Sequence, residues 1–80
     1  MIIEILFFGM ARDIVNENKI NLELNENKDV NFLVNLLEEK YPKFSSINSF
    51  SVAVNEEYVK KDIILKNNDT VAIIPPVSGG

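Results

Sequence analysis

The chain has 80 residues, of which 46% are hydrophobic and 25% charged, as expected for one small globular domain over residues 1–80. Its net charge of −4 comes without a basic stripe, which argues against nucleic acid and makes a basic protein surface the more natural partner. The absence of Cys and His excludes disulfides, thiolate metal sites and nucleophiles paired with histidine.

The N-terminus shows no sign of a targeting or membrane segment. No basic residues precede the first apolar run, and that run is far too short to cross a bilayer. We therefore expect a soluble, cytoplasmic protein with no membrane partner.

The first expected element is a strand over Ile2–Phe8, whose residues are mostly β-branched or aromatic. Side chains alternate between the two faces of a strand, and the carboxylate of Glu4 should not face a core. The residues on the opposite face, which we assign to the core, are Ile3, Ile5 and Phe7. Leu6 and Phe8 are then expected on the second face of the sheet, beside Glu4.

Gly9 ends this strand, and the segment Met10–Val15 can form a short helical turn. After a polar turn, residues Ile20–Leu24 alternate apolar and polar side chains, which predicts a half-buried strand. We expect the two strands to pair antiparallel through a connection longer than a tight hairpin.

One long helix follows, with Asp29 as a good N-cap and Pro42 as its stop. Its apolar residues recur at helical spacing and form one main stripe: Val30, Leu33, Val34, Leu37 and Tyr41. Phe32 and Leu36 lie nearly opposite that stripe. Two explanations stay open for this pair: a loop that covers it, which we favour because isolated apolar residues are common on surfaces, or a second contact surface.

The region before the last strand is less regular. Residues 43–50 are rich in Ser and Asn and are predicted to form an irregular loop. Ser51–Asn55 alternate again and predict a strand, followed by a turn at Glu56–Glu57 and a short returning strand at Tyr58–Val59. The remaining segments are a solvated charge run, a brief strand or turn, and a final turn: Lys60–Asp62, Ile63–Leu65 and Asn67–Asp69.

The last strand covers Thr70–Ile74 and is as apolar as the first. Val71 and Ile73 share one of its faces, and Ala72 and Ile74 share the other. We place the first and last strands side by side, parallel and central. The result is an α+β fold of the β-grasp (ubiquitin-like) type, a mixed sheet covered on one face by one main helix.

One helix covers only one face of such a sheet, so the other face should expose an apolar patch. Its residues would be Leu6, Phe8, Ala72 and Ile74. Patches of this kind on a small monomer usually mark an interaction site. The alternative is a bulge that shifts the register and buries these residues.

The chain ends in Pro75-Pro76-Val77-Ser78-Gly79-Gly80. Prolines fix φ and cannot donate hydrogen bonds to a sheet ladder, so Pro75-Pro76 form a stiff base for this segment. Its tip, Gly79-Gly80, has no side chains. Only three glycines occur in the chain, and two are the final residues. We therefore expect residues 75–80 to form a flexible tail that can enter a narrow channel of another protein; the alternative is a frayed end without function.

The chain resembles one known family over essentially its whole length, most clearly in three segments. They are Ile3–Phe8 with Ala11-Arg12, Ala53–Asn55 with Tyr58-Val59, and Asp69–Gly80. The chain is similar in them to the small subunits of molybdopterin synthase, ubiquitin-like sulfur carriers of the MoaD/ThiS family. The DxVAxxPPVxGG ending is the most specific segment. The chain departs from commoner members at Ile73-Ile74, where aromatic residues often occur, and at Ser78, where threonine is frequent.

The resemblance implies that the protein carries sulfur on its C-terminus. An ATP-dependent activating enzyme would adenylate the carboxylate of Gly80, with Gly79 as its slim neighbour, and sulfur would replace one oxygen to give a thiocarboxylate. The loaded tail would enter the large synthase subunit and donate sulfur to precursor Z (cyclic pyranopterin monophosphate), forming the dithiolene of molybdopterin. The domain itself would bind no cofactor or metal and supply no active site.

The resemblance also implies a partner-binding surface and an assembly. The residues we assign to partner binding are Phe8, Tyr58, Ile74, Pro75, Pro76 and Val77. The assembly would be a heterotetramer with two large subunits.

Two other functions stay open. A related carrier would keep the thiocarboxylate but serve thiamine thiazole synthesis, tRNA thiolation or conjugation to lysines as a protein modifier. A plain binding module would use the apolar sheet face and leave the tail inert. The PPVSGG ending and the chain length favour the molybdopterin branch over the shorter thiazole carriers.

Overall fold

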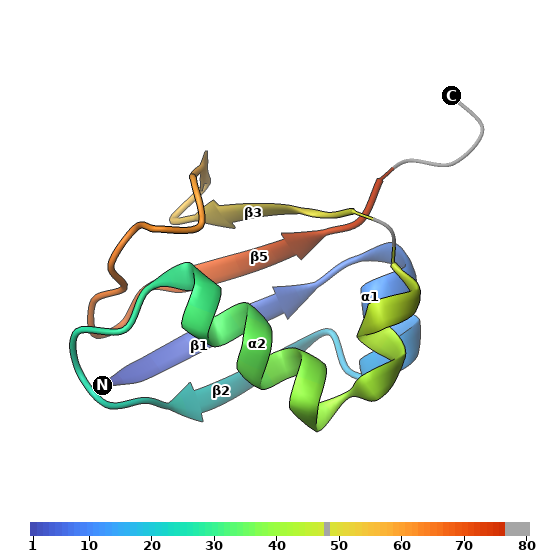
Figure 1. Ribbon diagram of the computed structural model, residues 1–80, viewed down its shortest axis with the longest axis horizontal. Helices are drawn as coiled ribbons and strands as arrows, with labels where there is room; N and C mark the ends of the chain where they lie inside the picture. Colours follow the sequence, from blue (N-terminus) through green and yellow to red (C-terminus); the bar gives the residue numbers. More distant parts are fainter. Residues whose placement is uncertain (48, 77–80) are drawn as a thin grey trace.

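The computed structural model describes residues 1–47 and 49–76. In this described part of the chain, five strands form one sheet in the order β2-β1-β5-β3-β4 (Figure 1). The strands are β1 (Ile2–Phe7), β2 (Lys19–Glu23), β3 (Ser51–Val54), β4 (Glu57–Tyr58) and β5 (Thr70–Ile74). The helices are α1 (Gly9–Val15), α2 (Val30–Lys40) and the 3-10 helix η1 (Pro42–Ser46).

The first and last strands lie side by side in the sheet, which confirms the arrangement predicted from the sequence. β1 and β5 pair parallel, with Ile5 opposite Val71. β2 pairs antiparallel with β1, and β3 pairs antiparallel with β5. The sheet is therefore mixed, and the strand that leads into the C-terminal tail is held on both sides.

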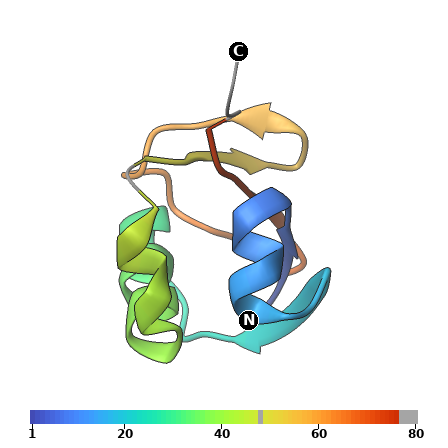
Figure 2. The same ribbon diagram turned by 90° about the vertical axis from the view of Figure 1, so that its right-hand side faces the viewer.

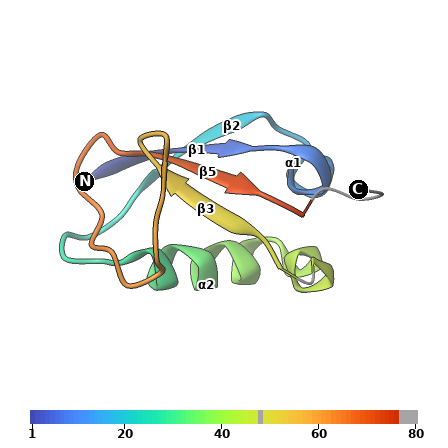
Figure 3. The same cartoon turned by 90° about the horizontal axis from the view of Figure 1, so that it is seen from above.

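The core lies between the sheet and α2, which covers one face of the sheet (Figures 2 and 3). The strand side chains that face α2 are buried: Ile3, Ile5, Phe7, Val71 and Ile73. From α2 the predicted stripe meets them with Val30, Leu33, Val34 and Leu37. Burying one such side chain contributes about 1.5–3 kcal/mol by removing apolar surface from water. This layer therefore fixes the register of the strands, and with it the residues left on the open face, the side of the sheet opposite α2.

Local signals set the ends of α2. The carboxylate of Asp29 accepts a hydrogen bond of 2.9 Å from the backbone N–H of the third helical residue, and the helix stops just before Pro42. The carbonyls of Lys61 and Ile63 accept two more N–H groups of the first turn, at 2.8 and 3.0 Å. The charge run and the segment after it thus complete the helix N-terminus.

The segment after α2 differs from the irregular loop predicted over residues 43–50. It begins with η1, and Phe44 in this helix is only 1% exposed. The ring of Phe44 packs against those of Phe7 and Tyr41, with centroids 6.1 and 6.0 Å away. The prediction is wrong because the Ser/Asn composition hid an aromatic residue that closes the end of the core, after a Pro42 that suits a helix start.

The favoured explanation for Phe32, a covering loop, is also wrong. Its side chain is 38% exposed, and the ammonium of Lys28 lies 4.5 Å from the ring centroid. A cation–π contact therefore shields the ring where a loop was expected. Leu36 is half-buried and packs against the core. A second contact surface at this pair stays a prediction.

The remaining boundaries agree with the sequence to within a residue or two. β1 ends at Phe7, and Phe8 is the extended N-cap residue of α1, which begins at Gly9. The bulge alternative is wrong, because β1 and β5 keep one continuous register. Among the helices of residues 1–47 and 49–76, none is long and apolar enough to cross a membrane.

The turn between β3 and β4 lies one residue earlier than predicted. Its two residues, Asn55 and Glu56, have positive φ angles of 51° and 74°. Consecutive positive φ angles between paired strands define a type I′ turn, which favours Asn and Gly. Glu56 carries a Cβ atom and adopts this backbone at a cost of roughly 1–2 kcal/mol.

Replacing Glu56 by glycine is therefore expected to stabilise the fold by about 0.5–1 kcal/mol, because glycine adopts positive φ freely. A thermal melt of Glu56→Gly should show a higher midpoint than the wild type. Glu57→Gly is the control, because Glu57 lies in β4 and glycine weakens a strand. A midpoint that fails to rise in Glu56→Gly would show that this turn stores no strain.

Candidate partner-binding surface

The open face carries the apolar side chains that strand alternation assigns to it. Leu6 in β1 lies opposite Ala72 in β5, and both are half-buried. Ile74, at the end of β5, is half-buried as well. Phe8, directly after β1, is 49% exposed. The patch expected from the sequence is therefore present, with its largest side chain accessible.

β3 and β4 extend this surface. Ala72 lies opposite Ala53 in β3, and Ala53 lies opposite Tyr58 in β4, whose side chain is 73% exposed. Residues opposite each other in neighbouring strands share a face. Ala53 is absent from the sequence prediction, because its place follows only from the pairing of β3 with β5. Ala53 itself is only 6% exposed, so it lies at the base of this surface and is covered by its neighbours. We define the apolar patch as Leu6, Phe8, Ala53, Tyr58, Ala72 and Ile74, with Ala53 as its buried base.

A polar row borders the apolar patch. The hydroxyl of Thr70 donates to Glu4 Oε1 at 3.3 Å, and Lys19 Nζ lies 3.6 Å from Glu4 Oε2. The Lys19–Glu4 pair is well exposed, so it adds little stability. The row confines the patch to the end of the sheet where the parallel strands β1 and β5 both finish, from which the tail departs.

The base of the tail lies beside the start of α1, at the end of the sheet where β5 finishes (Figure 1). Pro75 is half-buried and Pro76 exposed. A Cβ atom at Gly9 would lie 4.0 Å from Cγ of Pro75, so the two residues are neighbours. Gly9 has a φ of +52°, which lets the chain turn sharply from β1 into α1. The further tail residues with assigned roles, Val77, Gly79 and Gly80, lie outside the described residues.

Asn55 and Asp69, which belong to two of the motifs that resemble the family, are joined by a side-chain hydrogen bond. Asp69, directly before β5, is buried, and Asn55 Nδ2 donates to its Oδ1 at 2.9 Å. The other carboxylate oxygen accepts from the N–H of Lys66 at 2.7 Å, and Asn55 Oδ1 accepts from the N–H of Thr70 at 3.0 Å. Asn55 and Asp69 therefore tie the β3–β4 turn to the start of β5. Sequence reasoning missed this positioning role.

Asn55→Gly is expected to lower the free energy of unfolding by about 1–3 kcal/mol, because it removes one donor from a buried carboxylate and one acceptor from a backbone N–H. Glycine keeps the positive φ, so the loss reports the side chain alone. Asn16→Gly is the matched control, since Asn16 is exposed and has a φ of 63°. Urea unfolding measures both, and equal changes would contradict the role of Asn55.

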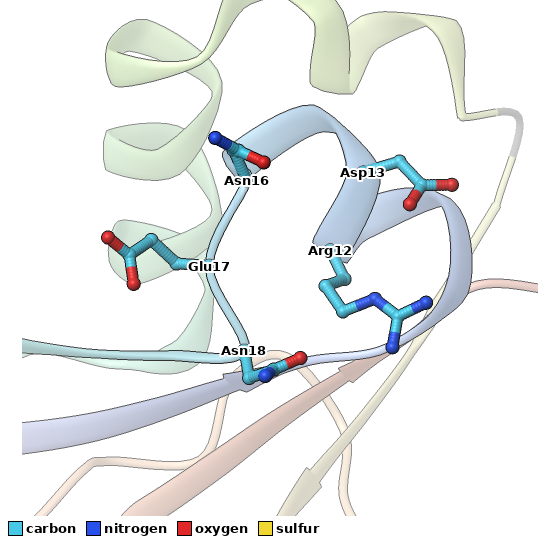
Figure 4. Close-up of a pocket in the computed structure, with 5 residues that line it drawn as sticks. All are labelled: Arg12, Asp13, Asn16, Glu17 and Asn18. Carbon is cyan, nitrogen blue, oxygen red and sulfur yellow. The ribbon is translucent and has the colours of Figure 1, made fainter.

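An open cavity of about 370 Å³ lies at the C-terminal end of α1 (Figure 4). Its lining residues are Arg12, Asp13, Asn16, Glu17 and Asn18. The charged ends of Arg12 and Glu17 point away from each other in Figure 4. Within the part of the chain that the structure describes, no group of three or more acidic side chains could hold a metal ion. We assign no chemistry to this cavity.

The mixed sheet, its parallel first and last strands and the open face beside the C-terminal exit define a ubiquitin-like protein of the β-grasp class. The chain belongs to the ThiS family, whose model matches residues 5–80. The match runs from β1 to the terminal diglycine and so includes the apolar patch and the tail.

The chain is similar to named carrier subunits over nearly its full length. The molybdopterin synthase sulfur carrier subunit of Dictyostelium discoideum is 38% identical over 81 residues, covering 96% of this chain and 94% of that protein. The protein of the same name from Chlamydomonas reinhardtii is 35% identical over 83 residues, covering 100% of both.

Solved structures share the fold. SAMP1 of Haloferax volcanii superposes with a TM-score of 0.88 over 100% of both chains, at 19% identity, which supports the fold alone. A chain in the complex of subunits 1 and 2 of the molybdopterin-converting factor from Helicobacter pylori superposes with a TM-score of 0.72, at 27% identity and over 100% of both chains.

Proposed function

We propose that this protein is the sulfur carrier subunit of molybdopterin synthase. The observation that carries the proposal is the near-full-length similarity to sulfur carrier subunits of that name. The similarity spans the strands that build the apolar patch and extends to the diglycine, the two features that a carrier needs.

The reactive atom in this function is the carbonyl carbon of Gly80. A carboxylate is a poor acyl donor, so an activating enzyme first transfers AMP from ATP to it and releases pyrophosphate. A sulfur nucleophile then displaces AMP and leaves a thiocarboxylate. This chain has neither Cys nor His, so the partner supplies the groups that drive both steps. ATP is used by that enzyme, and the carrier binds no cofactor.

The apolar patch is the surface that docks on the large synthase subunit. Phe8, Tyr58 and Ile74 provide its large side chains, and Pro75, Pro76 and Val77 lead the tail into the partner. The similar Helicobacter pylori chain occurs in a complex of subunits 1 and 2, which supports a two-subunit assembly.

In the cytoplasm, each loaded tail donates one sulfur atom to precursor Z, and hydrolysis of the resulting acyl–sulfur bond returns the tail as a carboxylate. Two such transfers supply the two sulfur atoms of the molybdopterin dithiolene. Two carriers bind two large subunits in the proposed heterotetramer.

Intact mass spectrometry of the protein purified from its own cells tests this function. We expect a fraction whose mass gain equals the exchange of one oxygen for sulfur, localised to Gly80 by fragmentation. The same gain should appear in vitro with ATP, the activating enzyme and a sulfur donor, and precursor Z together with the large subunit should then remove it. A thiocarboxylate that is discharged by a thiazole precursor or tRNA, and not by precursor Z, would assign the protein to the related carriers instead.

A further inference from the structure

We propose that the free edge of β2 pairs with the same edge of a second copy of this chain, giving an antiparallel dimer with one continuous sheet. Among residues 1–47 and 49–76, β2 is the outermost strand and pairs only with β1. In Figure 2 its ribbon, in cyan, borders the sheet with no other element beyond it. An open strand edge of this kind is a template for another strand.

The ladder shows which backbone groups of β2 are free for a second strand. The N–H of Leu24 donates to the carbonyl of Met1 at 2.8 Å, and the amino group of Met1 donates to the carbonyl of Leu24 at 2.7 Å. Bonded and non-bonded pairs alternate along antiparallel strands. The residues of β2 that direct N–H and C=O away from β1 are therefore Lys19, Asn21 and Glu23.

The same three residues select one register for self-pairing. With Asn21 on the two-fold axis, Lys19 lies opposite Glu23 of the second copy, and Glu23 lies opposite its Lys19. Each of these opposed pairs exchanges two backbone hydrogen bonds. A slip by two residues loses one pair and leaves Lys19 or Glu23 opposite Asn21, and a slip by one residue moves the side chains to the wrong face.

Apolar side chains fit the same register. Ile20 and Leu22 lie on the face toward α2 and are half-buried beside the core. In the dimer Ile20 lies opposite Leu22 of the second copy, at a non-hydrogen-bonded position where side chains come closest. An edge lysine usually discourages pairing. In the proposed dimer this lysine, Lys19, lies opposite Glu23 of the second copy. The same charges that disfavour pairing with other strands therefore favour pairing with a second copy of β2.

One strand pair buries far less surface than a standard interface, so the association should be weak and appear only at high concentration. β2 and β4 are opposite edges of the sheet, and the proposed pairing uses only residues of β2. The dimer therefore goes beyond the carrier function and does not depend on it. Removal of Gly80 should leave the association unchanged.

Charge-reversal variants of the β2 edge test the proposal. Their self-association is measured by sedimentation velocity at a series of protein concentrations up to the millimolar range. The weight-average mass of the wild type should rise toward that of two chains. Lys19→Glu sets Glu against Glu and Glu23→Lys sets Lys against Lys, so each should weaken association by roughly tenfold or more. An equimolar mixture of the two variants should associate again, because every Glu then meets a Lys.

Lys43→Glu, the same charge change at an exposed position in η1, is the control and should associate like the wild type. Thermal melts check that all variants are folded, since Lys19→Glu also loses the exposed contact with Glu4. Concentration-dependent NMR shifts should cluster in β2. A wild type that stays monomeric, edge variants that associate like Lys43→Glu, or a mixture that does not associate would each overturn the proposal.

Discussion

Removal of Gly80 is expected to abolish ATP-dependent activation and sulfur transfer while leaving the fold intact. One residue of extended chain spans about 3.5 Å. Reacting groups must be held within about 0.5 Å of the productive geometry, and a misplacement of about 1 Å can cost roughly 100-fold in rate. A tail that ends at Gly79 therefore presents its carboxylate short of the adenylating and sulfur-transfer sites, although the chemistry of the group is unchanged.

Pyrophosphate release with the activating enzyme measures the first step, and single-turnover conversion of precursor Z in the synthase complex measures the second. Both rates should fall by at least about 100-fold in the shortened chain. Affinity for the large subunit should change little, because the apolar patch is untouched. The thermal midpoint should also stay constant, since the core lies between α2 and the sheet.

Two matched variants sharpen this result. Ser78→Thr keeps the length of the tail and introduces the residue common in the family, so it should retain both rates. A chain extended by one glycine keeps every native residue and moves the terminal carboxylate, so it should lose both. A shortened protein that still supports cofactor synthesis would end the carrier proposal.

The main layers of the fold could be predicted because their signals are local. Glu4 marks the solvent side of β1, and alternation then sends Ile5 to the core, where it is fully buried. α2 carries a 3.6-residue apolar repeat, a capping Asp29 and a stop at Pro42. Each of these signals acts within a few residues, so tertiary contacts do not override it.

The features that were missed depend on residues far apart in the chain. Phe44 sits in a polar segment, and only its contact with Phe7 shows that it belongs to the core. Ala53 joins the apolar patch because β3 pairs with β5, and Asn55 finds Asp69 because the same pairing brings the β3–β4 turn to the start of β5. Alternation within a strand says which residues share a face, but not which strand lies next to it.

For the tail, by contrast, the sequence is more informative than the structure. The assignment of chemistry to Gly80 comes from the motif and the family alone, because these residues lie outside the described part of the chain. What the structure adds is the setting: the tail begins at Pro75, beside Gly9 and at the edge of the apolar patch. Docking and delivery are therefore coupled, since a partner that covers the patch also receives the start of the tail.

Phe8→Ala and Ile74→Asp are accordingly expected to weaken binding to the large subunit more than they destabilise the monomer. Phe8 is half exposed in the free chain, and Ile74 is half-buried at the end of β5. Truncation of an aromatic anchor at an interface typically costs about 2 kcal/mol or more, roughly 30-fold in affinity. An aspartate at position 74 would lie unpaired and desolvated under the partner, which adds a similar penalty.

Calorimetric titration against the large subunit, with thermal melts of the free carrier, separates the two effects. Stability should fall by no more than about 1 kcal/mol, because neither side chain belongs to the buried core. Phe32→Ala is the matched control: Phe32 is 38% exposed and Phe8 49% exposed, but Phe32 lies on α2, away from the open face. Loss of this partly exposed phenylalanine from the helix layer should leave affinity for the large subunit unchanged. If Phe32→Ala weakened binding as much as Phe8→Ala, the partner would have to contact the helix layer as well, and the docking surface would need to be reassigned.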